Sequence, residues 1–234
     1  LYWAGRGACR RFACALNIGS FGFFWWYIPE QIGTFAESVE DIENKTLIKM
    51  ERHPVLKLDW GRTTLEEKDW RTVALCCAML PYPLDKGQHE PFDRYLTGLG
   101  FLSKTDVHMQ FEANAYDEFF RALKSGMRTY GAWDGKEAFE FAFNRLIDQV
   151  VPTLDSAERK KYLDLGEQFN TPPPVKLSPI TLSEVGTIKV MCDGYFNRVF
   201  RDRANARADA EAAKNNAISG IQQRAASQIG PEAV

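Results

Sequence analysis

Apolar side chains recur every three or four residues along most of the chain, and proline or glycine interrupts the recurrence. This spacing places them on one face of an α-helix. Several of the stripes follow a hydroxyl or acidic residue with Glu or Asp three positions later, the arrangement of an N-terminal capping box. Sustained alternation with hairpin turns does not occur in the sequence. We therefore predict a mainly α protein with little or no sheet, and helices over residues 34–53, 64–80, 103–126, 134–150, 155–169 and from 183 onward.

The stretch from residue 12 to residue 29 carries no charged side chain. As one helix it would be about 27 Å long, against roughly 30 Å for the hydrocarbon core of a bilayer. Arginines precede it, acidic residues follow it, and aromatic residues gather at its end, as at a membrane–water interface. The pattern predicts a single N-terminal transmembrane helix. The residues expected to pack it against other helices, or to lie at the membrane interface, are Ala15, Gly19, Gly22, Trp25, Trp26 and Tyr27.

Three other interpretations of this stretch remain open. It is short and contains Asn17, which would suit a helix buried in a protein core. It could also lie in the membrane interface, or be a secretory signal cleaved near residues 34–36. If it is a span, the arginines predict that the N-terminus faces the matrix or cytoplasm. Most of the chain would then lie on the opposite side of the membrane, which for the mitochondrial inner membrane is the intermembrane space.

The C-terminal part changes in composition along a single predicted helix. A stiff proline-rich segment, "TPPPVKLSP", separates it from the preceding helices. The helix has an apolar side as far as Phe200, and beyond Arg201 it is rich in alanine, arginine and amides. Such a sequence favours helix but buries little, so we expect either a frayed tail or, as we prefer, an arm lying along another subunit. The stripe expected to contact that subunit is Ile218, Ile221, Ala225 and Ile229.

These features divide the chain into four parts. Residues 1–33 form an N-terminal flank and membrane anchor, and residues 34–170 form an irregular helical extramembrane domain. Residues 171–182 are a linker, and residues 183–234 are a long C-terminal helix or arm. The formal net charge of −2 gives no support to nucleic-acid binding. Five cysteines without paired spacing indicate neither a disulfide framework nor a zinc site.

One loop contains residues that could carry chemistry. "DKGQHEPFD" brings Asp85, His89, Glu90 and Asp93 together, and such side chains can bind a divalent metal or exchange protons. Their spacing matches no known metal or catalytic motif, and Glu90 and Asp93 suit the start of a helix at Pro91. We therefore predict no catalytic residue, cofactor or metal ligand. Two aromatic residues off the main stripes, Phe120 and Phe141, are candidates for contact with another protein.

In layout, this anchor, helical domain and arm resemble the supernumerary subunits of mitochondrial inner-membrane complexes. The resemblance implies a non-catalytic accessory subunit of a respiratory electron-transfer complex, with an assembly or stabilising role. Its partners would be the other subunits of a large membrane complex, and membrane lipid. A peripheral subunit of a mitochondrial F-type ATP synthase has a similar layout. A membrane-anchored enzyme or metal-binding protein using the His89 loop is the third possibility.

Overall fold

The structure of the chain is a computed structural model. It describes residues 2–24, 38–41, 46–50, 65–82, 84, 89–102, 111–170 and 178–228. Within these ranges, the side chains of residues 2–6, of the two strands and of residues 220–228 are not described.

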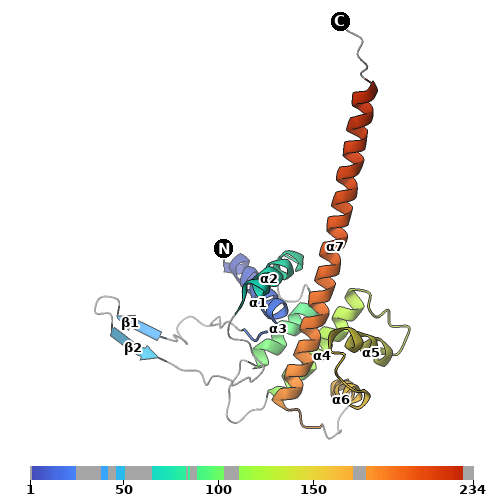
Figure 1. Cartoon of the computed structure of the whole chain (residues 1–234). Coiled ribbons are helices and arrows are strands. Elements are labelled where there is room, and N and C mark those ends of the chain that lie inside the picture. The colour runs from blue at the N-terminus through green and yellow to red at the C-terminus, as the bar shows by residue number, and fades with distance from the viewer. Residues whose placement is uncertain are drawn as a thin grey trace.

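The described residues are mainly helical, as predicted (Figure 1). A short 3₁₀ turn, Gln168–Asn170, follows the sixth helix. α7 is by far the longest element, and its C-terminal part projects away from the other helices. The α-helices are α1 (Tyr2–Ser20), α2 (Glu67–Met79), α3 (Glu90–Leu102), α4 (Glu112–Thr129), α5 (Phe139–Val150), α6 (Ser156–Glu167) and α7 (Leu182–Gln228).

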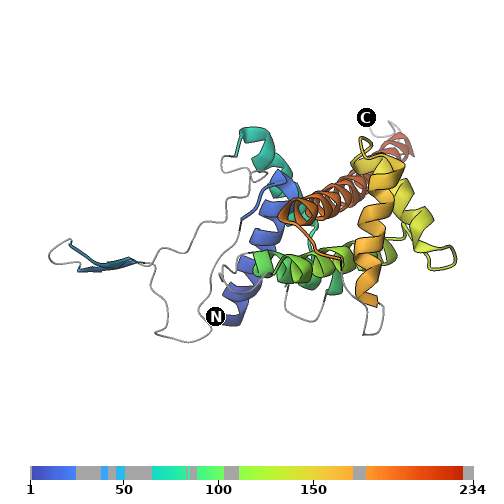
Figure 2. The same cartoon turned by 90° about the horizontal axis from the view of Figure 1, so that it is seen from below.

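The N-terminal half of α7 is the centre of the fold. Figure 2 shows it between the α1–α2 pair and α5–α6, with α3 and α4 crossing on one side. The sequence of this half has an apolar side as far as Phe200, and such a side packs against a protein core. The fully buried residues of this half include Val185, Ile188, Met191, Cys192, Phe196 and Phe200.

Aromatic rings fill the space between α7, α3 and α4. The ring of Phe196 lies 5.2 Å from that of Phe92 and 5.5 Å from that of Tyr195, measured between centroids. Gly126 on α4 allows this packing, because a Cβ atom there would lie 2.7 Å from the Phe196 ring. A larger residue at position 126 would therefore separate α4 from α7.

Phe120 and Phe141 have different environments. Phe120, which we expected to face another protein, is buried inside this chain, where its ring covers Gly166 and lies edge-on to Phe139. The prediction for Phe120 was wrong because α6 covers a second face of α4. Phe141 is 62% exposed.

Helix starts agree with the predicted capping boxes only in part. The box at Asp155 and Glu158 is present before α6. Before α2 a capping box is formed by Glu66 and Asp69. The predicted Thr64 lies outside the described residues. α4 begins after Phe111 and α5 after Ala138, without a side-chain cap.

α7 begins one residue before the predicted Ser183. Thr181 and Glu184 cap it: the Thr181 backbone N–H donates to the Glu184 carboxylate over 2.6 Å. "TLSE" is a capping-box sequence, so this start was readable from the sequence. Of the predicted linker, residues 171–177 lie outside the described residues.

The prediction of a helix over residues 34–53 was wrong. The described residues of this segment form two antiparallel strands, β1 (Ser38–Asp41) and β2 (Thr46–Met50), in which Val39 pairs with Lys49. The two strands contain the β-branched residues Val39, Thr46 and Ile48, which favour a strand. The helical spacing of apolar residues in this segment was only approximate and too short to identify a helix.

The predicted helix over residues 12–29 differs most from the structure. α1 begins ten residues before it and ends at Ser20, and the chain then turns at Phe21, whose φ is 56°. No helix among the described residues is sufficiently long and apolar to cross a membrane. Residues 25–29, which include Trp25, Trp26 and Tyr27, lie outside the described residues.

α1 is instead packed into the helical body. Cys14, Ala15 and Ile18 are fully buried. Gly19 makes a very close contact, since a Cβ atom there would lie 2.7 Å from the backbone of Val73 in α2. The small residues thus allow two helices to approach closely, and the second helix belongs to the same chain. Of the alternatives for residues 12–20, the core helix is the one that the structure contains.

Candidate functional site

α7 changes from a buried to an exposed helix at Phe200. We call residues 201–228 the arm. Every residue from Arg201 to Ser219 is exposed except Ala204, which is half-buried. The arm is about 42 Å long at 1.5 Å per residue. Figure 1 shows it extending beyond the other helices.

The predicted contact stripe lies near the end of the arm. Ile218 is 44% exposed, so its side chain is available to a partner. The side chains of Ile221 and Ala225 are not described, and Ile229 lies outside the described residues. The contact role of this stripe stays a prediction.

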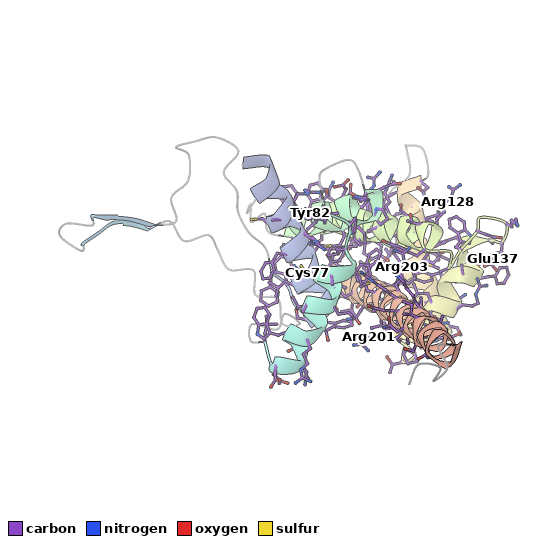
Figure 3. The ribbon with its side chains drawn as sticks, turned by 90° about the horizontal axis from the view of Figure 1, so that it is seen from above. Cys77, Tyr82, Arg128, Glu137, Arg201 and Arg203 are labelled. Atoms are coloured by element: carbon purple, nitrogen blue, oxygen red, sulfur yellow. The ribbon has the colours of Figure 1, made fainter. Side chains whose placement is uncertain are left out.

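The base of the arm is held by a cation–π contact. The guanidinium of Arg203 lies 4.6 Å from the centre of the Tyr130 ring, just after the end of α4. In Figure 3, which looks down on the molecule, Arg203 and Arg201 lie on α7. Cys77 and Tyr82 lie on the α2 side, and Glu137 lies on the opposite side, beyond Arg128. The arm therefore leaves the body between these two groups of helices.

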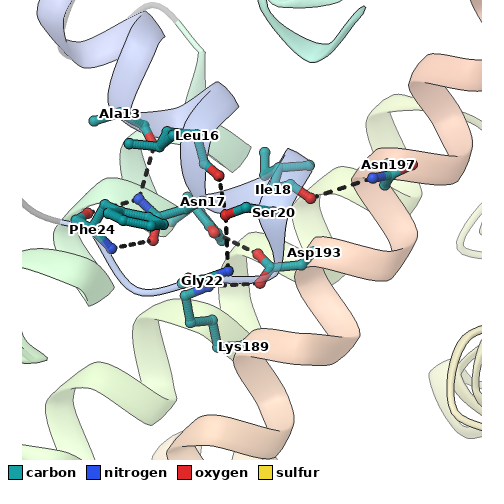
Figure 4. A network of polar contacts seen from close by, with 11 residues as sticks. Ala13, Leu16, Asn17, Ile18, Ser20, Gly22, Phe24, Lys189, Asp193 and Asn197 are labelled. Carbon is teal, nitrogen blue, oxygen red and sulfur yellow. Dashed lines mark hydrogen bonds and ion pairs between the residues drawn. The ribbon is translucent and has the colours of Figure 1, made fainter. Parts of the chain in front are cut away.

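A second feature, which we call the polar clamp, joins α7 to α3 and to the end of α1. It consists of Tyr95 and of four residues labelled in Figure 4, Asn17, Lys189, Asp193 and Asn197. All five are buried. Lys189 and Asp193 form an ion pair of 2.6 Å with no exposed side-chain surface. The Tyr95 hydroxyl donates to the other oxygen of Asp193 over 2.5 Å. Both charged groups therefore have partners inside the protein.

The clamp also satisfies backbone groups where α1 ends. Lys189 Nζ donates to the carbonyl of Gly22 over 2.5 Å. The Asn17 side chain accepts from the Phe24 backbone N–H over 3.0 Å and donates to the Phe24 carbonyl over 2.7 Å. Asn197 donates to the Ile18 carbonyl over 3.4 Å. The last carbonyls of a helix have no partner within it, and a cation near them is favourable.

Burial controls the protonation of the clamp. It raises the pKa of Asp193, against the opposing effects of the Lys189 charge and of the hydrogen bonds from Lys189 and Tyr95. Burial, with the neighbouring Asp193, also raises the pKa of Tyr95. Burial raises the pKa of the Cys14 and Cys192 thiols well above the usual value. Thiols in this state are poor nucleophiles, so this region has the character of a structural core.

Sequence reasoning missed the clamp, although one signal was available. Lys189 and Asp193 lie four residues apart in the otherwise apolar stretch "VGTIKVMCDGYF". Charged groups are rarely buried unless they are paired, so two opposite charges at this spacing on a core helix indicate a buried ion pair. Tyr95, on a distant segment, carries no such signal.

The residues of the His89 loop serve the fold. The His89 carbonyl accepts from the backbone N–H groups of Phe92 and Asp93 at the start of α3. Asp93 pairs with Arg10 of α1 over 2.5 Å, and Glu90 accepts a hydrogen bond from Ser125 over 3.2 Å. Asp85 lies outside the described residues. Within the described part of the chain, no three metal-binding side chains lie together.

Comparison with protein-family models, with curated proteins and with solved structures gives no match to this chain.

Proposed function

We propose that the chain is a non-catalytic accessory subunit of a mitochondrial inner-membrane respiratory electron-transfer complex, which it helps to assemble or stabilise. The observation that supports this proposal best is the division of α7, whose first half is the core of the body and whose second half is an exposed arm. One continuous helix thus connects the helical body to a surface that projects from it.

The energetics of the arm favour a partner. Isolated helices gain little stability from propensity alone, and in proteins most of it comes from packing. Between Asn205 and Ser219 every residue of the arm is exposed, so packing within the chain buries little of it. Burial against another subunit would supply the missing stabilisation, at roughly 25 cal/mol per Å² of apolar surface removed from water.

The polar groups inside the body support a structural role. The buried charges of the clamp are used within the chain, and so are Glu90 and Asp93 of the His89 loop. A metal-binding use of Asp93 would have to compete with the Arg10–Asp93 pair that joins α1 to α3. A long projecting helix also suits a peripheral subunit of an F-type ATP synthase, and the identity of co-purifying subunits distinguishes the two complexes.

Deletion of residues 206–234 tests the function of the arm. This variant keeps Arg203 and its contact with Tyr130, so the body should retain its thermal stability. We expect the truncated chain to be lost from the large assembly when mitochondria are solubilised in mild detergent and resolved on a native gel. Normal melting of the truncated body is the control. Unchanged migration of the truncated chain within the large assembly would contradict the proposal.

Attachment to the membrane is a separate part of the proposal. Because residues 13–20 are almost entirely buried in the body, we assign attachment to neighbouring subunits and not to a span over residues 12–29. We expect alkaline carbonate to release the chain from mitochondrial membranes into the supernatant, beside a known integral protein that stays in the pellet. Retention of the chain in the pellet would support the predicted span and would contradict this assignment.

A further inference from the structure

α1 and α2 form an antiparallel pair at the edge of the body (Figure 3). Gly19 lies against Val73, whereas Arg11, two turns earlier in α1, donates to the Leu80 carbonyl, two turns later in α2. One side of the pair packs on α7 and α3. The opposite side is therefore a surface made by two parallel ridges of side chains.

This opposite side, which we call the outer face, is apolar. Its residues follow each other at the helical spacings of three and four and are exposed or half-buried. They are Cys9, Phe12 and Leu16 of α1, and Trp70, Ala74 and Cys77 of α2. Neither residues 12–24 nor residues 72–84 contain a charged side chain. A helix face that meets water normally carries charged or polar residues, so the outer face has the composition of a contact surface.

The exposed large apolar side chains of the described residues gather at this face. Phe12 and Trp70 lie on it and are 49% and 48% exposed. Phe21 and Tyr82, which follow the ends of α1 and α2, are exposed as well. The remaining two, Phe141 and Ile218, lie singly on α5 and on the arm. Single exposed apolar residues are ordinary, whereas a group of them marks an interaction site.

The chemistry of the outer face favours lipid over protein. A protein interface carries about one hydrogen bond per 100–200 Å², but the side chains of this face offer little beyond the indole N–H of Trp70 and the hydroxyl of Tyr82. Such rings prefer the headgroup level of a bilayer, where one end is apolar and the other is wet. The Arg11 guanidinium lies 5.2 Å from the centre of the Tyr82 ring and so places a cation where lipid phosphates would lie. Acyl chains require no hydrogen bonds, and the backbone groups of both helices are paired within the helices.

We propose that the outer face of the α1–α2 pair rests on the surface of a lipid bilayer. Phe12 and Trp70 enter the upper part of the acyl chains, while Arg11 and Tyr82 lie at headgroup level. The contact is interfacial, so both helices remain packed in the body and neither crosses the membrane. This inference goes beyond the proposed function and does not rest on it, because it gives the chain a lipid contact in addition to its contacts with neighbouring subunits.

Flotation of the purified full chain with vesicles tests the proposal. We expect binding to phosphatidylcholine vesicles, with or without phosphatidylglycerol, and little change when salt is added, because burial of apolar surface is not screened. Phe12→Ser with Trp70→Ser should lower the partition coefficient by about tenfold or more. Phe141→Ser with Ile218→Ser removes two equally exposed apolar side chains elsewhere and should bind as the unchanged chain. All four positions are exposed, so both variants should melt as the unchanged chain does.

Tryptophan fluorescence provides a second measurement, on a variant that keeps the face apolar. Phosphatidylcholine brominated on its acyl chains should quench the unchanged chain, and Trp70→Phe should float normally but show less quenching. Absence of vesicle binding, binding that salt abolishes, or equal loss in both serine pairs would overturn the proposal. Vesicle binding absent while Phe12→Ser with Trp70→Ser abolishes self-association in sedimentation, or removes the chain from the large assembly, would show that a protein covers the face and would also overturn it.

Discussion

Replacement of Lys189 by Met is expected to destabilise the fold by about 3–5 kcal/mol, because it leaves Asp193 buried without its cation. The replacement also removes the hydrogen bond that Lys189 donates to the Gly22 carbonyl, just after the end of α1. Urea denaturation of the purified chain, followed by far-ultraviolet circular dichroism, measures this change. The expected result is a lower midpoint with an unchanged slope.

Two control variants show whether the destabilisation comes from leaving a buried charge unpaired. Lys189→Met combined with Asp193→Leu removes both charges, so it should recover much of the lost stability, since an apolar pair has no desolvation cost. Arg71→Met breaks the Glu67–Arg71 pair, which has the same four-residue spacing but lies on the surface, and should change stability little. A Lys189→Met midpoint as close to the wild-type value as that of Arg71→Met would show that the clamp is not a buried ion pair.

Replacement of Phe196 by Ala is expected to cost about 3–5 kcal/mol, as in other deletions of a large buried ring. Phe196 is fully buried and lies against Phe92, Tyr95 and Phe200. Ile218→Ala, at the other end of the same helix, should leave the melting temperature almost unchanged, because Ile218 is exposed. Thermal unfolding of both variants checks this contrast.

The contrast between Phe196 and Ile218 also tests the division of α7. If Ile218→Ala destabilised the isolated chain as much as Phe196→Ala, the outer half of the helix would pack on its own body. The arm would then lack the free surface on which the proposed function depends. If Ile218→Ala leaves stability intact but weakens incorporation into the assembly, the predicted contact stripe gains direct support.

The clamp and the arm belong to one helix, and this has a consequence for assembly. Lys189 and Asp193 hold the end of α1, and the arm begins two turns beyond Asp193. The body thereby fixes the direction in which the arm leaves it. A subunit that joins neighbours needs such a fixed direction, since each freely rotating joint adds an ordering cost on binding.

The helical character of the chain was determined locally. The four-residue spacing of Ala115, Phe119 and Leu123 predicts α4, and Asp155 with Glu158 predicts the start of α6, because both signals act within one or two helical turns. The long C-terminal helix and its change of composition after Phe200 were equally readable. The exposed arm follows from that change, since small and charged residues give little reason for burial.

Tertiary structure decided which surface each apolar face meets. The apolar side chains of residues 12–20 would leave water in lipid as well as against α2 and α7. The contact of Gly19 with Val73 and the hydrogen bond from Asn197 to the Ile18 carbonyl place this segment against its own chain. Phe120 is covered by α6. Tyr95, which donates a hydrogen bond to Asp193, lies almost a hundred residues away from it in the sequence. Periodicity along a chain records that a face is apolar or polar, but the neighbour of that face is set by contacts between distant segments.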